Sequence, residues 1–323
     1  MCTAVAYNHK NFCFGRTLDF EFLYPCSVVF APRRFPFDFR HEKREGSHYA
    51  ILGMACVFEG CPLYFDAVNE EGLCMAGLNF VGNAVYRKPK EGKENIASFE
   101  FIPYILGKCK SVKEAKVLLQ NINITDTAFK DDLPPSQLHW IIADKEESVV
   151  VESVAQGIKV HQNDVGVLTN NPPFEYHLEN LEKYSFLSPF QAEEKALQKE
   201  YSEFSRGTGA VGLPGDFTSQ SRFIRAAFLR KYSHSSDTSG ADMNQLFHIL
   251  SGVAVPEGAC VTEKGEYDKT LYTCAIDAKH GIYSYKSYDS QGVFSVDMRK
   301  ENPDSEMLVA YPFLTEAPFV NLN

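Results

Sequence analysis

Short apolar segments separated by polar turns dominate the first quarter of the chain. They alternate apolar and polar residues or stay apolar for about four to eight positions, which is typical of half-buried or fully buried strands. The polar stretch Asn8–Asn11 predicts a hairpin loop between the first two segments. We expect strands within residues 2–7, 12–18, 25–33, 48–60 and 62–80, the last range holding two strands hinged at residues 69–72.

In the middle of the chain the apolar side chains recur every three to four residues, which predicts helices. Two helices are expected at 98–109 and 111–122, the second with Ser111 as its N-cap. Residues 138–172 then predict a meander of strands. The remaining predictions are a helix at 177–187, a polar irregular stretch to residue 216, helices at 221–232 and 241–253, and strands at 269–289 and 292–299.

This order of elements, strands, then helices, then strands again, indicates an α+β fold. We expect two antiparallel sheets with helices on their outer faces. The sequence has no internal repeat and no long linker, and the polar segment 233–242 is interpreted as a surface loop. Residues 1–323 are therefore predicted to form a single domain.

Composition narrows the class of protein. A hydrophobic fraction of 44% and a charged fraction of 23% are ordinary for a globular protein. The net charge of −10 and pI near 5.4 argue against nucleic acid as a partner. No apolar run reaches the ~18 residues of a membrane span. Nine cysteines without a CxxC pair favour a reducing, cytoplasmic location over a disulfide scaffold.

The glycine-rich segment and the histidines give only weak evidence for a dinucleotide or metal site. Gly207, Gly209 and Gly212 spell GxGxxG, but Pro214 follows closely and no apolar strand precedes them, so we interpret them as a glycine-rich loop and not as a dinucleotide site. The nine histidines lack the HxxxH or HExxH spacing of a metal site. We expect neither an organic cofactor nor a metal.

The start of the chain carries candidate chemistry. If residues 8–11 form the loop, Cys2 lies opposite Thr17, and Arg16 and Asp19 fall within two residues of it across the ladder. A guanidinium favours a thiolate over a thiol, and a carboxylate orients an α-amine that is suited to proton transfer near neutral pH. The alternative is a surface ion pair between Arg16 and Asp19 beside an inert cysteine.

Several segments together resemble a known family. Met-Cys-Thr followed by FGRTLDF is similar to the start of the choloylglycine hydrolases, cysteine members of the N-terminal nucleophile hydrolases. The segments YFDAVNEEGLCMAGLNF, LHW, VLTNNPPFEYHLENL, GLPGDFTSQSRFIRAAF, KTLYTCAID and GIYSYKSYD follow in family order. The resemblance spans nearly the whole chain and implies a four-layer αββα fold, with two antiparallel sheets sandwiched between helix layers.

The resemblance also implies catalytic roles near the N-terminus. Cys2 matches the nucleophile, and removal of Met1 frees its α-amine to act as the base. Arg16 and Asp19 take the roles just described.

Three further residues match the family's active site. Asn79 is implied to offer a backbone donor, and Asn170 a side-chain donor, to the oxyanion of the tetrahedral intermediate; losing one such donor typically costs ~3 kcal/mol of barrier. Arg222 matches the second active-site arginine. Taken alone, Asn170 is an ordinary turn residue and Arg222 an ordinary residue at a helix N-terminus.

The implied reaction is hydrolysis of a linear amide. Asn79 and Trp140 match members that act on bile salts, which implies cleavage of glycine- and taurine-conjugated bile acids by a cytoplasmic homotetramer. A penicillin V acylase, an acylase of N-acyl homoserine lactones and an inactive homologue that binds amphiphiles stay open. A papain-like protease is disfavoured because no cysteine lies in that family's signature.

Overall fold

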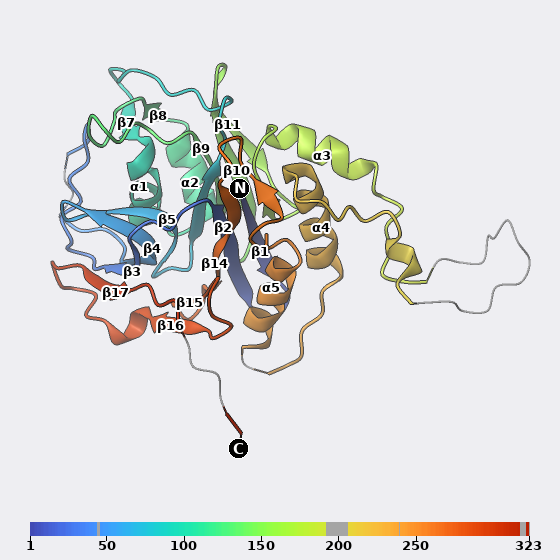
Figure 1. Cartoon of the computed structure of the whole chain (residues 1–323). Coiled ribbons are helices and arrows are strands. Elements are labelled where there is room, and N and C mark those ends of the chain that lie inside the picture. The colour runs from blue at the N-terminus through green and yellow to red at the C-terminus, as the bar shows by residue number, and fades with distance from the viewer. Residues whose placement is uncertain (44–45, 192–205, 239, 317–320, 323) are drawn as a thin grey trace, which may run out of the picture.

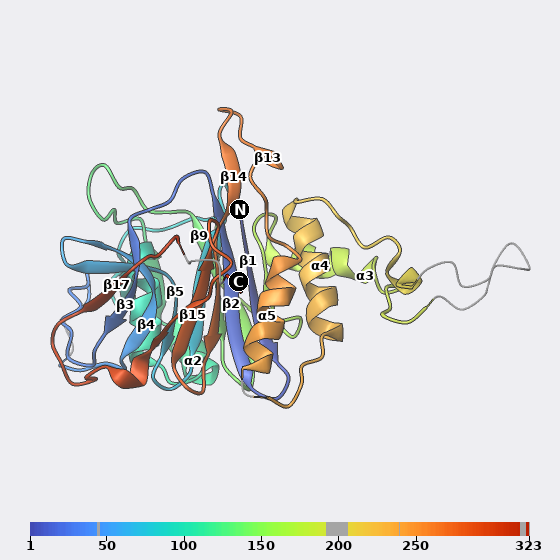
Figure 2. The ribbon, with the colours of Figure 1, turned by 60° about the horizontal axis from the view of Figure 1, so that its bottom comes forward.

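The computed structural model describes residues 1–43, 46–191, 206–238, 240–316 and 321–322. Two large antiparallel sheets lie face to face within it (Figures 1 and 2). Sheet A contains, in spatial order, β12 (Val167–Leu168), β1 (Cys2–Asn8), β2 (Phe12–Phe20), β14 (Tyr267–Asp277), β15 (Ile282–Ser287) and β16 (Phe294–Asp297), with β13 (Cys260–Val261) paired to β14. Sheet B contains β11 (Gly157–Gln162), β10 (Ser148–Val154), β9 (Leu138–Ala143), β6 (Cys74–Asn79), β5 (Cys61–Asn69), β4 (Ile51–Phe58), β3 (Cys26–Ala31) and β17 (Val309–Pro312).

Helices cover the outer face of each sheet. On sheet B lie α1 (Phe101–Lys108) and α2 (Val112–Leu119), beside the short parallel pair β7 (Glu94–Ala97) and β8 (Ile122–Thr125). On sheet A lie α4 (Ser219–Tyr232) and α5 (Ala241–Ser251), with α3 (Phe174–Glu182) packed on α4. Short 3-10 helices span Ser98–Glu100, Thr208–Ala210 and Met298–Lys300. The predicted four-layer αββα arrangement is therefore confirmed (Figure 2).

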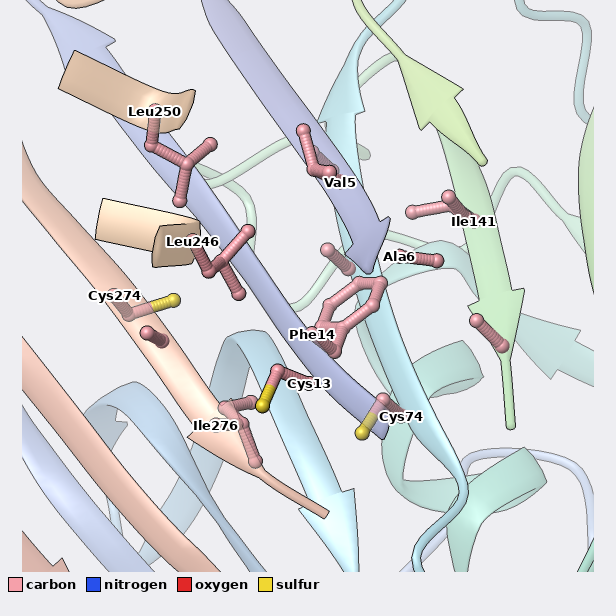
Figure 3. Close-up of a cluster of buried hydrophobic side chains, with 14 of the residues drawn as sticks. Val5, Ala6, Cys13, Phe14, Cys74, Ile141, Leu246, Leu250, Cys274 and Ile276 are labelled. Atoms are coloured by element: carbon pink, nitrogen blue, oxygen red, sulfur yellow. The ribbon is translucent and has the colours of Figure 1, made fainter. Parts of the chain in front are cut away.

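The near-continuous apolar runs of sheet B arise because both of its faces are buried. In β3, Val28 and Phe30 point toward sheet A, whereas Val29 points toward the helix layer. Trp140 of β9 is fully buried on the helix side, 4.5 Å from the ring of Phe101. Figure 3 shows part of the core around sheet A, with side chains from β1, β2, β6, β9, β14 and α5.

The β1–β2 hairpin differs by one residue from its predicted register. Cys2 pairs with Leu18 instead of Thr17, and the loop contains three residues, 9–11. Arg16 pairs with Ala4. Paired residues share a face and the side-chain period is two, so Cys2 and Arg16 lie on the same face of sheet A. In the predicted register they would have lain on opposite faces.

A β-bulge interrupts β5. Tyr64 pairs with Ala55 and Asp66 with Met54, which leaves Phe65 as the extra residue. Tyr64 consequently packs on the helix side of sheet B, while Asp66 points the other way, toward sheet A. The bulge thus delivers a carboxylate into the space between the sheets.

Other elements confirm or correct the sequence predictions. Ser111 caps α2 by accepting a hydrogen bond of 3.3 Å from the Glu114 backbone. The helix expected at 177–187 instead spans Phe174–Glu182, with Pro173 as its N-cap. The expected meander is only partly correct, since β12 leaves sheet B and pairs with β1.

The irregular stretch expected before residue 216 lies partly outside the described residues, at 192–205. The glycine-rich loop that follows packs closely on the preceding chain: a Cβ at Gly209 would stand 1.9 Å from the Phe190 carbonyl oxygen. All nine cysteines are free thiols. Among the described residues, no helix combines the length and hydropathy required to cross a membrane.

Candidate active site

The Cys2 thiol lies at the head of β1 in contact with a buried guanidinium. Arg16 Nη2 donates a hydrogen bond of 2.6 Å to Cys2 Sγ. The Cys2 side chain is 4% exposed and Arg16 is 1% exposed, so little water separates the two groups. In such a setting the positive charge stabilises a thiolate far more than it would in bulk water.

Three backbone carbonyls hold the Arg16 guanidinium in place. Nη1 donates to Gly77 O at 2.9 Å and to Phe65 O at 3.3 Å, and Nε donates to Thr17 O at 3.2 Å. Burial by itself would lower the pKa of Arg16, but the electrostatic influence of Cys2, Tyr272 and Asp66 raises this pKa above its usual value. The guanidinium is therefore a fixed cation beside the thiol.

Asn170 connects the backbone of Cys2 to two other elements. Its Oδ1 accepts from Cys2 N at 2.7 Å and from Arg222 Nη2 at 2.8 Å. Its Nδ2 donates to Asn79 O at 2.9 Å. Because an amide nitrogen carries two hydrogens, the second remains for another acceptor near Cys2. Asn79 enters this site through its carbonyl; the donor role expected for it remains a prediction.

Arg222, from the first turn of α4, reaches the opposite side of β1. Its Nη1 donates to the Cys2 carbonyl oxygen and, at 2.7 Å, to Thr3 Oγ1. Asp19 Oδ2 lies 4.0 Å from the same nitrogen, and both side chains are fully buried. Burial lowers the pKa of Arg222, while Asp19 and Cys2 oppose this change.

Asp19 is held by hydroxyl groups. Its Oδ1 accepts from Thr270 Oγ1 at 2.6 Å and its Oδ2 from Thr17 Oγ1 at 3.3 Å. The N-terminal amine, which is that of Met1 in this structure, contacts the Asp19 carbonyl oxygen at 2.7 Å and Asp268 Oδ2 at 3.2 Å. The carboxylate nearest to this amine is thus that of Asp268.

A buried polar network supports the loop that carries Asn170. Ser219 Oγ accepts from the Asn170 backbone at 2.9 Å, and His177 Nε2 contacts the Asn170 carbonyl oxygen at 2.9 Å. His139 bridges the Thr169 carbonyl oxygen at 2.9 Å and Glu152 Oε1 at 3.2 Å. Because His139, Glu152 and His177 are buried, these hydrogen bonds hold the Asn170 loop firmly against the core.

The structure brings all six predicted residues together, although they come from five separate segments of the chain. It also adds residues that sequence reasoning missed, namely Thr3, Asp66, Asp268 and Thr270. Thr3, Asp66 and Thr270 had an indirect signal, since each belongs to a segment that carries the family resemblance. Trp140, which matches the family members that act on bile salts, packs on the helix side of sheet B.

Two facing antiparallel sheets between helix layers, with a cysteine at the head of a central strand, define an N-terminal nucleophile hydrolase fold. A model of the linear amide C–N hydrolases, choloylglycine hydrolase family, matches residues 2–311. The chain belongs to the choloylglycine hydrolase family.

Individual relatives match along the full chain. A protein of Lactiplantibacillus plantarum described as a bile salt hydrolase/transferase is 44% identical, with 100% of each chain covered. One of Clostridium perfringens with the same description is 39% identical, with 97% of each chain covered. The crystal structure of the C2A mutant of the conjugated bile acid hydrolase from C. perfringens superposes with a TM-score of 0.94 at 38% identity, covering both chains completely.

Proposed function

We propose that this enzyme hydrolyses the amide bond of glycine- and taurine-conjugated bile acids. The observation that carries the proposal is the contact of 2.6 Å between the Cys2 thiol and the buried Arg16 guanidinium, in a chain similar over its full length to proteins described as bile salt hydrolases. Removal of Met1 leaves Cys2 with a free α-amine next to its own thiolate.

The reaction then follows from the groups present. The Cys2 thiolate attacks the amide carbonyl carbon, and a donor hydrogen of Asn170 stabilises the negative oxygen that develops. The α-amine transfers its proton to the departing nitrogen, and the carbon–nitrogen bond breaks to leave a thioester on Cys2. A water molecule, deprotonated by the same amine, hydrolyses the thioester and releases the bile acid.

An aromatic surface adjoins this site and suits an apolar acyl group. The ring of Phe20 lies 4.9 Å from that of Phe22 and 5.5 Å from that of Tyr24, and Tyr24 lies 5.8 Å from Phe65. Phe22 is 54% exposed, although burial of so large a ring is favourable. The Phe65 carbonyl oxygen contacts Arg16, so the cluster lies next to the nucleophile. A steroid nucleus offers the extended apolar face that would cover it.

A competition assay tests the substrate. Purified enzyme and its Cys2→Ala variant receive glycocholate, taurocholate, penicillin V and a long-chain N-acyl homoserine lactone in one tube, with products read by mass spectrometry. Release of cholate ahead of the other acids, and only with Cys2 present, is expected. Phenoxyacetate or a fatty acid released first would reassign the enzyme as a penicillin V or homoserine lactone acylase.

The N-terminus and the assembly need separate measurements. Intact-mass analysis is expected to show loss of Met1; an intact Met1 with no turnover would favour an inactive amphiphile-binding homologue. The proposal includes a homotetramer, as the family resemblance implies, and light scattering is expected to give four times the chain mass. The nine free thiols support a reducing, cytoplasmic location.

A further inference from the structure

Two buried arginine–aspartate pairs flank Cys2, one on each face of sheet A. Arg222 and Asp19 form the pair on the helix side, 4.0 Å apart. Arg16 and Asp66 form the pair between the sheets, with Arg16 Nε 3.9 Å from Asp66 Oδ2. Neither a sequence motif nor the family resemblance assigns a role to Asp66.

The hydrogen-bond donors around Asp66 are arranged to stabilise its ionised form, although burial raises its pKa above the usual value. Tyr272 donates to Oδ2 at 2.5 Å and Tyr283 to Oδ1 at 2.6 Å, while the Cys274 thiol approaches Oδ1 at 3.4 Å. Three donors directed at two oxygens match a carboxylate, which only accepts hydrogen bonds. Burial raises the pKa of Asp66, and the adjacent Arg16 and the tyrosine hydroxyls oppose that rise.

The location of Asp66 in the core indicates a purpose beyond stability. It is fully buried, in a layer that otherwise consists mostly of apolar side chains. A buried ion pair of this kind is commonly no more stabilising than apolar residues of the same size. Its partner, however, is the guanidinium that contacts the nucleophile, so Asp66 acts on Cys2 through Arg16.

We propose that Asp66 is a positioning residue for the amide hydrolysis: it is the counter-charge that sets how strongly Arg16 stabilises the Cys2 thiolate. The three carbonyls that bind Arg16 fix its position, and Asp66 fixes its net electrostatic effect. The inference rests on the proposed role of Cys2 as the nucleophile. Asp66 limits the thiolate's stabilisation and so keeps the sulfur basic enough to attack an amide.

Titratable groups around this pair come from β1, β3, α4, β14 and β15, and that of β3 is Cys26, which interacts electrostatically with Asp66. From β1 comes Cys2, and from α4 comes Arg222, which contacts the Cys2 carbonyl oxygen. From β14 and β15 come the groups that donate to the carboxylate, which are Tyr272, Cys274 and Tyr283. The neutral donors change little in charge near neutral pH, so the effect of Asp66 can be measured on Cys2 directly.

The test is the pH dependence of Cys2 alkylation by iodoacetamide, followed by mass spectrometry of the N-terminal peptide in Met1-free enzyme. In Asp66→Asn the midpoint is expected about one pH unit lower than in the wild type, as for a unit charge removed at about 8 Å in an effective dielectric of about 20 to 40. The acid limb of kcat/KM is expected to move with it. Asp242→Asn, which changes another buried aspartate, is the control and is expected to leave the midpoint unchanged.

A second pair of variants keeps the test valid if Asp66→Asn does not fold. Tyr283→Phe removes one donor and concentrates negative charge on Asp66, so the midpoint is expected a few tenths of a pH unit higher. Tyr64→Phe, a buried tyrosine that donates to the Val29 carbonyl oxygen at 3.3 Å, is the matched control.

An unchanged midpoint in a folded Asp66→Asn enzyme, or a shift to higher pH, overturns the proposal. If only Tyr283→Phe can be measured, the proposal is overturned when its alkylation midpoint moves to lower pH or equals that of Tyr64→Phe. Alkylation requires no bile salt, so a failure of the proposed substrate would appear in the competition assay alone.

Discussion

Asn170 Oδ1 lies 2.7 Å from the nitrogen of Cys2, although 168 residues separate them in sequence. This contact crosses from a loop after β12 to the head of β1. It fixes the direction of the lone pair or proton on that nitrogen once Met1 is removed. The orientation of the base is therefore determined by a side chain that also contacts Arg222 and Asn79.

Replacing Asn170 by alanine is expected to lower kcat about 100- to 1000-fold, because it removes one oxyanion donor and the acceptor that orients the amine. Steady-state hydrolysis of glycocholate provides the measurement. Asn171→Ala is the matched control: the Asn171 side chain donates to the Val81 carbonyl oxygen, and this variant is expected to keep most activity. Equal losses in both variants would show that loop integrity, not the amide of Asn170, is responsible.

Replacing Arg222 by lysine is expected to lower kcat about 100-fold. An ammonium group cannot reproduce the planar fork that binds Cys2 O, Thr3 Oγ1 and Asn170 Oδ1 together. The comparison is Arg225→Lys, one helical turn away, where Arg225 donates to three backbone carbonyls remote from Cys2. Thermal unfolding is expected to show a loss of stability in both variants. Steady-state kinetics are expected to show a large loss of kcat only in Arg222→Lys. Normal turnover by Arg222→Lys would contradict the assigned role.

Stability is expected to fall between about pH 6.5 and pH 4 because of His177. Burial lowers the pKa of His177 to about 4, whereas a histidine in an unfolded chain titrates near ~6.5. Between pH 6.5 and pH 4 His177 is protonated in the unfolded state but not in the folded state. The folded state therefore keeps its full stability above pH 6.5 and loses part of it as the pH falls to 4. The loss is about 3 kcal/mol.

His177→Gln keeps a hydrogen-bond donor near the Asn170 carbonyl oxygen but does not titrate. Urea unfolding at several pH values is expected to show a smaller acid-side loss for this variant than for the wild type. Equal losses of stability in the two proteins would assign the effect to other titrating groups. Glu152 is one of them but titrates at lower pH: burial alone would raise its pKa, but hydrogen bonds from His139 and His161 lower it to about 2.

Gly15→Ala is expected to destabilise the fold by about 2–3 kcal/mol. A Cβ at Gly15 would stand 2.3 Å from the Cys274 carbonyl oxygen, and backbone atoms of β14 cannot move without disturbing the ladder beside Arg16. Gly215→Ala, where no atom lies within 4 Å of the added carbon, is the control and is expected to unfold like the wild type. Differential scanning calorimetry of both variants checks this, and equal melting temperatures would refute it.

The sequence was sufficient to predict the four layers, because strands and helices have different apolar periods. It also placed Arg16 and Asp19 near Cys2, since a hairpin brings close residues together. It did not fix the register, because polar residues 8–11 fit a loop of three residues as well as one of four. That single residue decides whether Arg16 shares a face with Cys2.

Residues contributed by distant strands carried no local signal. Asp66 lies in a segment that carries the family resemblance, but neither it nor Asp268 stands out by residue type or spacing, and their contacts arise only when β5 faces sheet A and β14 pairs with β2. Trp140 carried part of the family resemblance without belonging to the site, because it packs against Phe101 on the helix side of sheet B.

The extra residue in β5 changes which face of sheet B the neighbouring side chains point to. In a regular strand Tyr64 and Asp66 would point to the same face of sheet B, because side chains alternate. With Phe65 inserted as the bulge residue they point to opposite faces, so Asp66 faces sheet A and Tyr64 faces the helices. Deleting Phe65 would keep Asp66 in the chain but would turn either this carboxylate or Tyr64 and the residues before it to the other side of the sheet. When relatives are compared, the length of this segment therefore matters as much as the identity of its residues. An aspartate shifted by one position would point to the helix side of sheet B and could not contact Arg16.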